Sequence, residues 1–304
     1  MPSVILYYEN GQPSRKSWHE NDKWHREGDL PAIIKYYPNG QPYKKSWYKN
    51  GQLLKKSWYE NDKLHREEDL PAKIEYFENG QPSTQSWYKN GNKHREGNLP
   101  AYIYYYENGQ PKIEFWHKND KWCREGDLPA VIEYHENGQL LKEIWYEGGK
   151  LHREGDLPAK IFYYENGQPT TKSWYKNGKL EKESWYKNGK LHKEDLPALI
   201  EYYENGQPKI KVWYKNGNYH REGDLPTVIQ YDENGQLEKE SCNQNGNEYI
   251  EDLPVIQYDE NGQLEKESCN QNGNEYIEDL PVVEYDENGN EYIEGYFPTL
   301  CNLL

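Results

Sequence analysis

The tripeptide Asp-Leu-Pro, or its variant Asn-Leu-Pro, occurs nine times along this chain. Successive copies begin 40, 29, 29, 29, 39, 29, 28 and 27 residues apart. A period in this range is typical of repeat proteins, in which small supersecondary units stack on their neighbours and bury their apolar faces together. The sequence therefore predicts a long repetitive surface and not one enclosed pocket. The copies start at Asp29, Asp69, Asn98, Asp127, Asp156, Asp195, Asp224, Asp252 and Asp279.

Two-residue turn signals divide each repeat into short strands. The chain has 17 Asn-Gly pairs, three Asn-Asp pairs and one Gly-Gly pair. These residues are preferred in type I′ hairpin turns, in which both central residues have positive φ. The signals are mostly 11 and 18 residues apart, which indicates three short strands in each unit of about 29 residues. The proline closes the unit because it cannot donate a hydrogen bond to a strand ladder.

Alternation along the first strand of each unit predicts which side is buried. Ile-x-Tyr recurs, as in Ile132 and Tyr134, with a residue between them that is usually polar. This is the pattern of an antiparallel sheet with one buried face. The second strand carries a tryptophan, for which a core position is favoured by its large area and an exposed aromatic row is the alternative. These tryptophans are Trp47, Trp87, Trp116, Trp145, Trp174 and Trp213.

The two long steps of 40 and 39 residues each equal one unit plus one extra strand, at residues 49–59 and 176–186. A meander accepts a single added strand anywhere, whereas a closed coil with a fixed number of sides would have to bulge. We therefore expect an all-β, elongated repeat protein, an antiparallel β-meander of three-strand units.

Composition limits the class of protein. Only 34% of the residues are hydrophobic, but the 30 Tyr and 11 Trp and the regular turn signals argue against disorder. No run is apolar enough for a membrane helix or a signal peptide, so we expect an intracellular, soluble protein. Cys123, Cys242, Cys269 and Cys301 form no CxxC pair, which favours free thiols.

Charge and repetition change near the C-terminus. The net charge is −15, and from residue 228 onward 19 acidic residues face only Lys239 and Lys266. Residues 228–254 recur unchanged as residues 255–281. We expect three regions: a near-neutral repeat array at 1–227, acidic degenerate repeats at 228–295, and an apolar cap at 296–304. The acidic region would repel nucleic acid and attract a basic partner.

The runs Tyr-Tyr-Glu-Asn-Gly-Gln, as at residues 7–12, and Trp-Tyr-Lys-Asn-Gly, as at residues 47–51, resemble the MORN-repeat variants over nearly the whole chain. The unit here is longer than the standard MORN pattern and adds a His-Arg-Glu-Gly-Asp-Leu-Pro segment. The resemblance implies aromatic and glycine-rich β-hairpins that act as scaffolds or adaptors, sometimes near membranes. It also implies kinship with antitoxin-like bacterial proteins and with proteins of giant DNA viruses, for which a virion component is in keeping.

Repeated chemistry argues against an active site. His-Arg-Glu or His-Lys-Glu begins at His25, His65, His94, His152, His192 and His220, whereas catalysis needs one asymmetric set of groups. A structural role is favoured over metal ligation, because three strands per unit would separate equivalent histidines by about 14 Å. Asp-Glu-Asn-Gly lacks the spacing of a calcium loop, and no phosphate, dinucleotide or nucleic-acid motif is present. We expect no cofactor and no enzyme activity.

These observations favour a non-enzymatic scaffold that engages other proteins, copies of itself or a larger assembly such as a virion. The alternatives are an aromatic-stripe module that binds carbohydrate or choline-like groups, and an antitoxin-like protein. Burial of the tryptophans separates the scaffold from the ligand-binding module. The candidate interaction surface comprises Trp47, Trp87, Trp116, Trp145, Trp174 and Trp213, with Phe297, Leu300, Leu303 and Leu304 of the tail.

Overall fold

A computed structural model describes residues 1–223, 225–241, 255–258, 264–268, 284–285 and 291–292. The chain divides into two compact units, Met1–Ser184 and Trp185–Leu304. Every regular element in the described residues is a β-strand, which confirms the predicted all-β repeat class. In that part of the chain no helix is long and apolar enough to cross a membrane. The predicted regions 1–227, 228–295 and 296–304 stay a prediction, and the apolar tail lies outside the described residues.

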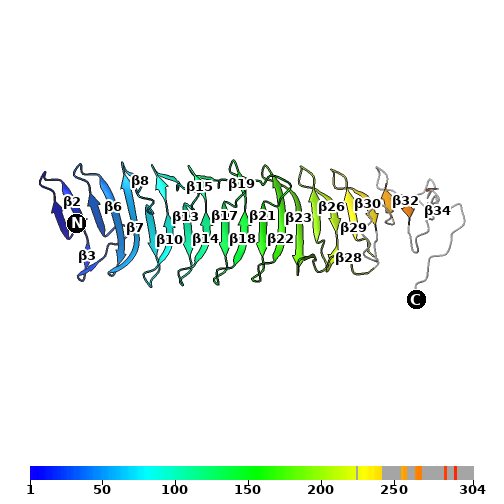
Figure 1. The fold of residues 1–304 in the computed structure, drawn as a ribbon, viewed down its shortest axis with the longest axis horizontal. Coiled ribbons are helices and arrows are strands. Elements are labelled where there is room, and N and C mark those ends of the chain that lie inside the picture. The colour runs from blue at the N-terminus through cyan, green and yellow to red at the C-terminus, as the bar shows by residue number, and fades with distance from the viewer. Residues whose placement is uncertain (224, 242–254, 259–263, 269–283, 286–290, 293–304) are drawn as a thin grey trace. The chain divides into compact units, whose positions relative to one another are not determined.

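The main sheet of the first unit is an antiparallel meander that follows chain order (Figure 1). Each inner strand pairs with the main-sheet strand before it and the one after it. The strands are β1 (Val4–Tyr7), β2 (Pro13–Ser17), β5 (Ile33–Tyr36), β6 (Pro42–Lys49), β7 (Gln52–Glu60), β9 (Lys73–Tyr76), β10 (Pro82–Ser86), β13 (Tyr102–Tyr105), β14 (Pro111–Phe115), β17 (Val131–Tyr134), β18 (Leu140–Ile144), β21 (Lys160–Tyr163) and β22 (Pro169–Lys176).

The sequence predicts three short strands per unit, and in the structure two strands of a regular repeat join the main sheet. After the tryptophan the chain forms a separate small hairpin with two paired residues on each side. The small strands are β3 (His19–Glu20), β4 (Lys23–Trp24), β8 (Lys63–Leu64), β11 (Tyr88–Lys89), β12 (Asn92–Lys93), β15 (His117–Lys118), β16 (Lys121–Trp122), β19 (Tyr146–Glu147) and β20 (Lys150–Leu151). Consecutive repeats are therefore about 10 Å apart along the sheet, two strand spacings and not three.

The inserted strands are confirmed. At the first long step β6 and β7 form one extended hairpin within the main sheet, and the end of β7 pairs with β8. At the second long step, β22 is followed by β23 (Lys179–Lys187).

The second unit repeats the pattern. Its main-sheet strands pair in chain order, and β23 with β24 and β27 with β28 form small hairpins. The strands are β24 (Lys190–Leu191), β25 (Leu199–Tyr202), β26 (Pro208–Val212), β27 (Tyr214–Lys215), β28 (Asn218–Tyr219), β29 (Val228–Tyr231), β30 (Leu237–Ser241), β31 (Val255–Tyr258) and β32 (Leu264–Ser268), and β33 (Glu284–Tyr285) pairs with β34 (Glu291–Tyr292).

The Asn-Gly turns are of two kinds, so the single type I′ prediction is half wrong. In the Lys-Asn-Gly turns, such as Asn90-Gly91, both residues have positive φ, as type I′ requires. In the Glu-Asn-Gly-Gln turns, such as Asn108-Gly109, only the glycine has positive φ. There the glycine amide bonds to the carbonyl three residues earlier, which is a type I turn followed by a left-handed glycine.

The core lies on one face of the sheet and joins successive repeats. Trp116 packs with Ala130 and Ile132 of the following repeat, and half-buried Tyr134 covers them. The Trp116 amide donates to the Ala130 carbonyl at 2.8 Å. Alanine at this position is 0–1% exposed in every repeat from Ala32 to Ala198, which leaves no room for a larger side chain. The predicted Ile-x-Tyr core stripe is confirmed.

Candidate interaction edge of the repeats

A cationic side chain, in most repeats an arginine, covers a buried or half-buried tryptophan of each described repeat. In the first unit the guanidinium carbon of Arg153, from the His-Arg-Glu segment, lies 3.9 Å from the centre of the Trp145 ring. Equivalent pairs stack at 3.8–4.0 Å in the other repeats, and Lys193 replaces arginine over Trp185 at 3.6 Å. Stacking of a cation on the indole face is favourable and shields the ring from water. The ring thus belongs to the interior of the repeat.

The same arginine joins two repeats. Its Nη1 donates to the proline carbonyl five residues later, as Arg95 does to Pro100 at 3.3 Å. Arg95 Nε and Nη2 also donate to both carboxylate oxygens of Asp69 in the preceding repeat, at 2.8 and 2.7 Å. Arg153 holds Asp127 in the same way. These hydrogen bonds, with the charge of the arginine, lower the pKa of Asp69 and of Asp127.

The repeated histidine forms a second link between repeats. The backbone N–H of Asn50 donates to Nδ1 of His25 at 3.2 Å, so Nδ1 is the acceptor and Nε2 carries the proton of the neutral ring. Nε2 lies 2.9 Å from Glu27. His65, His152 and His192 accept from Asn90, Asn177 and Asn216 in the same way. The sequence motif is therefore explained by stacking and hydrogen bonding.

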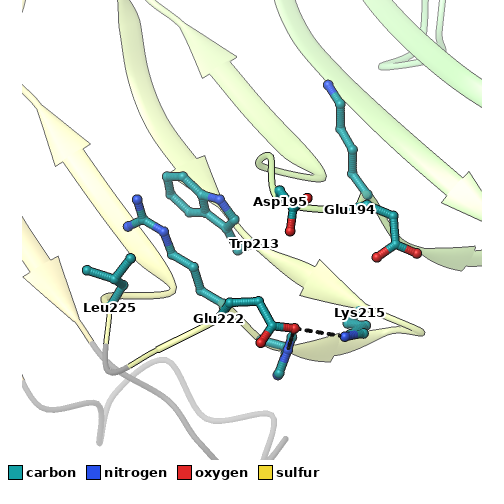
Figure 2. A pocket seen from close by; sticks show the side chains of 9 residues that line it. Glu194, Asp195, Trp213, Lys215, Glu222 and Leu225 are labelled. Carbon is teal, nitrogen blue, oxygen red and sulfur yellow. Dashed lines mark hydrogen bonds and ion pairs between the residues drawn. The ribbon is translucent and has the colours of Figure 1, made fainter.

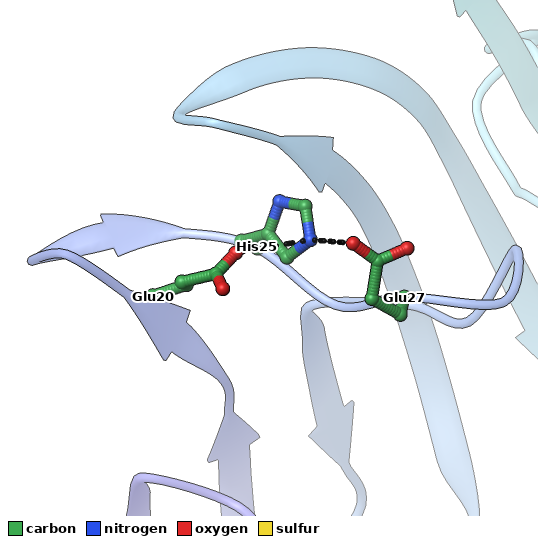
Figure 3. A group of neighbouring side chains, drawn as sticks. All are labelled: Glu20, His25 and Glu27. Carbon is green, nitrogen blue, oxygen red and sulfur yellow. Dashed lines mark hydrogen bonds and ion pairs between the residues drawn. The ribbon is translucent and has the colours of Figure 1, made fainter.

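Three of these histidines lie between two glutamates and resemble a metal site. Figure 3 shows His25 between Glu20 and Glu27, with Nε2 at 3.4 and 2.9 Å from their oxygens. The clusters at His65 and His152 have the same arrangement. A metal bound at Nε2 would need the proton on Nδ1, where it would face the Asn50 N–H donor. The hydrogen bond between repeats therefore opposes metal ligation, and one proton shared toward two carboxylates accounts for the geometry.

Where lysine replaces the first glutamate, the same position forms an ion pair. Lys89 Nζ lies 2.8 Å from Glu96, which His94 also contacts at 3.0 Å. The Lys89 and His94 hydrogen bonds lower the pKa of Glu96 to about 2. Lys118, Lys187 and Lys215 pair with the corresponding glutamates.

Small clefts separate successive His-Arg-Glu segments. One of about 160 Å³ lies between the loops that carry His65 and His94, and the next of about 230 Å³ lies beside Trp116. A cleft of about 160 Å³ in the second unit is shown in Figure 2, where Trp213 lies above the Lys215–Glu222 ion pair in this view. Each has the volume of one or two side chains and mixed charge. The clefts recur with the repeat and bring together no unique reactive group.

The leucine of every described Asp-Leu-Pro turn is exposed. We call these residues the leucine edge: Leu30, Leu70, Leu99, Leu128 and Leu157 in the first unit, and Leu196 and Leu225 in the second. Their exposed fractions are 40–54%, although isolated loops usually place polar residues there. The sequence analysis does not identify this edge, because Asp-Leu-Pro indicates a turn and the exposure of its leucine depends on tertiary packing. The sequence signal for this edge is that the leucine recurs beside proline outside the alternating apolar pattern of the strands.

The candidate surface expected from tryptophan is not exposed as a row. Trp87, Trp116, Trp145 and Trp213 are 4–7% exposed, and half-buried Trp47 and Trp174 donate from Nε1 to the carbonyls of Asp29 and Asp156. The sequence favours core positions for these residues, and this is confirmed for the four buried tryptophans. Phe297, Leu300, Leu303 and Leu304 lie outside the described residues, so their role stays a prediction.

An aromatic patch occupies the opposite face of the first unit. Tyr102, Tyr104 and Phe115 contact one another with ring centres 4.8–6.2 Å apart. His117 continues the patch to Trp122, and Tyr104 and Trp122 are more than a third exposed. Burial and the Tyr104 hydroxyl raise the pKa of Tyr102. In the other described repeats the positions of Tyr102, Tyr104 and Phe115 carry polar or aliphatic residues, except for Phe162.

Comparison with curated proteins and with solved structures gives no informative relative. No curated protein matches the chain. Among solved structures, the crystal structure of TcdB2-TccC3 is 9% identical over 88% of this chain, with a TM-score of 0.14. The crystal structure of TcdB2-TccC3-Cdc42 is 10% identical over 88%, with a TM-score of 0.13. This chain covers only 16% of either protein chain, and scores so low support no conclusion about fold or function.

The family model described as MORN repeat variant matches six segments, residues 101–119, 130–144, 170–188, 199–216, 227–243 and 251–270. The first five include the hairpins that carry the core and the small hairpins or turns beside it. The chain belongs to the MORN repeat variant family.

Proposed function

We propose that this protein is a non-enzymatic repeat scaffold that binds other proteins through the leucine edge. MORN repeats generally mediate protein–protein or membrane interactions. The observation that carries the proposal is the exposure of an apolar side chain at the same turn of every described repeat. Repeated apolar exposure on a rigid framework is typical of a binding surface.

Spacing and charge make this edge suitable for a protein partner. Leu70, Leu99, Leu128 and Leu157 follow at steps of two strands, about 10 Å each. Burying one half-exposed leucine contributes about 1 kcal/mol, so the four provide about 4 kcal/mol before the cost of association. The adjacent Glu67, Glu96, Glu125 and Glu154 are strongly exposed carboxylates, which disfavour an anionic membrane surface. A larger assembly, for example a virion, is the setting that we propose.

Site-specific crosslinking tests the proposal. A photo-crosslinking residue at Leu128 is compared with one at Asn137, an exposed turn residue on the opposite edge of the sheet. We expect Leu128, and not Asn137, to capture a partner in the native source. Binding of the purified partner is then measured for the full chain and for Leu99→Asp with Leu128→Asp.

We expect the double variant to weaken binding at least about tenfold, the equivalent of about 1.4 kcal/mol. Leu54→Asp is the matched control, since Leu54 is 39% exposed but lies on β7 away from this edge. Equal crosslinking at both edges, or unchanged binding of the double variant, would refute the proposal. If the chain binds anionic vesicles and no protein, the partner of the leucine edge is a membrane and the proposal is refuted.

The aromatic patch supports a second candidate function, binding of a carbohydrate or a quaternary ammonium group. Tyr104 and Trp122 present exposed ring surface beside Phe115, and such rings bind both ligand types. Titration with soluble oligosaccharides and with choline, followed by NMR, should shift the ring signals of wild type and not of Tyr104→Ala. No shift with either ligand would exclude this function.

A further inference from the structure

Asn-Gly pairs are chemically reactive as well as turn-forming. The glycine backbone nitrogen attacks Cγ of the asparagine side chain, ammonia leaves and a succinimide ring forms. Water then opens either side of the ring and leaves aspartate or isoaspartate. Glycine permits the attack because no side chain crowds the nitrogen. The described residues contain 13 such pairs, so tertiary structure decides which of them reacts.

Eight pairs lie in Asn-Gly-Gln turns, of which seven have the sequence Glu-Asn-Gly-Gln and one has the sequence Pro-Asn-Gly-Gln. In each the glycine N–H donates to the carbonyl three residues earlier, as Gly109 does to Tyr106 at 2.9 Å. The asparagine side chain is also held, since Asn108 Oδ1 accepts from the Gln110 amide at 2.9 Å and Nδ2 donates to the Glu136 carbonyl. The glycines are Gly11, Gly40, Gly80, Gly109, Gly138, Gly167, Gly206 and Gly235.

Four pairs in Lys-Asn-Gly turns are held by the preceding repeat. Gly91 donates to the Leu64 carbonyl at 2.9 Å, and the Asn90 amide donates to His65 Nδ1. The Gly51, Gly178 and Gly217 amides have equivalent acceptors. Attack on the asparagine side chain would require each glycine to give up its hydrogen bond.

The pair Asn188-Gly189 differs from these twelve. Both residues are exposed, and within the described part of the chain no protein acceptor takes either amide. The cause is the inserted strand β23. The Leu151 carbonyl and His152 Nδ1 already accept hydrogen bonds from Gly178 and Asn177 of the preceding turn. Among the described residues, no second carbonyl and imidazole accept from the amides of the added turn.

The other insertion avoids this situation by its sequence. Its extra turn is Asn61-Asp62, in which both residues have positive φ but the second is not glycine. A side chain on the attacking residue slows ring closure. Within the described part of the chain, the added turn at residues 188–189 is therefore the one Asn-Gly turn whose backbone amides bond to no neighbouring repeat.

We propose that, among the 13 Asn-Gly pairs in the described residues, Asn188 is the site of spontaneous deamidation in the folded protein. Gly189 N bonds to Asn188 Cγ, the bond from Cγ to the side-chain nitrogen breaks, and ammonia leaves. Hydrolysis then adds one negative charge to the β23–β24 hairpin, with an extra backbone atom in the isoaspartate product. A single hydrogen bond that the other twelve must break corresponds to about a tenfold difference in rate.

The full chain is incubated in mildly alkaline buffer, digested with a protease that cleaves after glutamate, and followed by mass spectrometry. Cleavage at Glu183 and Glu194 isolates residues 184–194 with one Asn-Gly pair. We expect this segment to gain the mass of deamidation about tenfold faster than the other described pairs. Gly189→Asp, which reproduces the Asn-Asp turn of residues 61–62, should suppress the change and retain the circular dichroism spectrum of wild type.

The same chain in concentrated urea provides the second arm. Unfolding removes every acceptor, so all 13 pairs should react at similar rates and the preference for Asn188 should disappear. The proposal is overturned if Asn188 in the folded chain reacts no faster than Asn90 or Asn177. It is equally overturned if the preference persists in urea, because local sequence and not tertiary structure would then be its cause.

Discussion

His117 provides a direct measurement of how the sheet controls ionisation. Its side chain is 8% exposed and lies on the outer face with Phe115 and Trp122, ring centres 6.2 and 6.4 Å away. Burial, followed by the charge of Lys93, lowers the pKa of this imidazole to about 4. The ring is therefore neutral in the folded chain over the whole range in which an exposed histidine titrates.

The magnitude follows from proton linkage. An unfolded histidine has a pKa of about 6.5, and the difference from about 4 corresponds to at most about 3 kcal/mol of folding free energy. Above pH about 6.5 the ring is neutral in both states and this stability is fully present. As the pH falls, the unfolded chain binds the proton first, so stability decreases and the contribution is lost by about pH 4. We expect a measured loss of about 1–3 kcal/mol.

His117→Tyr isolates this effect, because Tyr88 and Tyr146 occupy the same position in the neighbouring repeats. Urea unfolding and amide hydrogen exchange of β15 and β16 are measured at about pH 7 and about pH 4.5 for both proteins, on either side of the ordinary histidine pKa. The wild type should lose stability relative to H117Y as the pH falls, since all other histidines are shared. An NMR titration of His117 near the ordinary pKa of about 6.5, or an equal pH dependence of the two proteins, would contradict the reasoning.

Three further outcomes are expected. Asp69→Asn should cost about 0.5–1 kcal/mol in urea unfolding and lose its effect at high salt, because it removes one side of an exposed bidentate pair with Arg95; an unchanged midpoint would show that the natural Asn98 is equivalent. Glu147→Lys should raise the melting temperature slightly, because two carboxylates then no longer share one imidazole at His152; a decrease would point to a cation between them. Zinc should leave the melting temperature unchanged, whereas a rise that is abolished in Glu147→Lys would establish metal ligation.

The regular parts of the fold are predictable because they depend on local pattern. Ile-x-Tyr alternation identified the buried face, and Asn-Gly signals located nearly every hairpin. The sequence did not reveal that the segment after tryptophan leaves the main sheet, because this segment has the same turn signals as the main sheet. Whether a short segment such as β15 joins that sheet depends on contacts that spacing alone does not encode.

The candidate interaction edge was also not predictable from spacing alone. Trp145 and Arg153 are visible in the sequence as parts of a repeating motif, but their stacking is a contact between distant atoms. Once the indole is covered, Leu157 becomes the exposed apolar residue of the repeat. The burial of tryptophan agrees with its large hydrophobic area, whereas the exposure of leucine is decided by the tertiary structure.

Period, turn chemistry and alternation are properties of neighbouring residues, and from them the residues alone establish a β-repeat chain with two inserted strands. Contacts between repeats 25–28 residues apart settle the rest. They make His25 Nδ1 a hydrogen-bond acceptor and pair Arg95 with Asp69, and among the described residues they provide no acceptor for the amides of Asn188 and Gly189. Identical local sequences therefore differ in chemistry, because an acceptor supplied by the preceding repeat can be used only once.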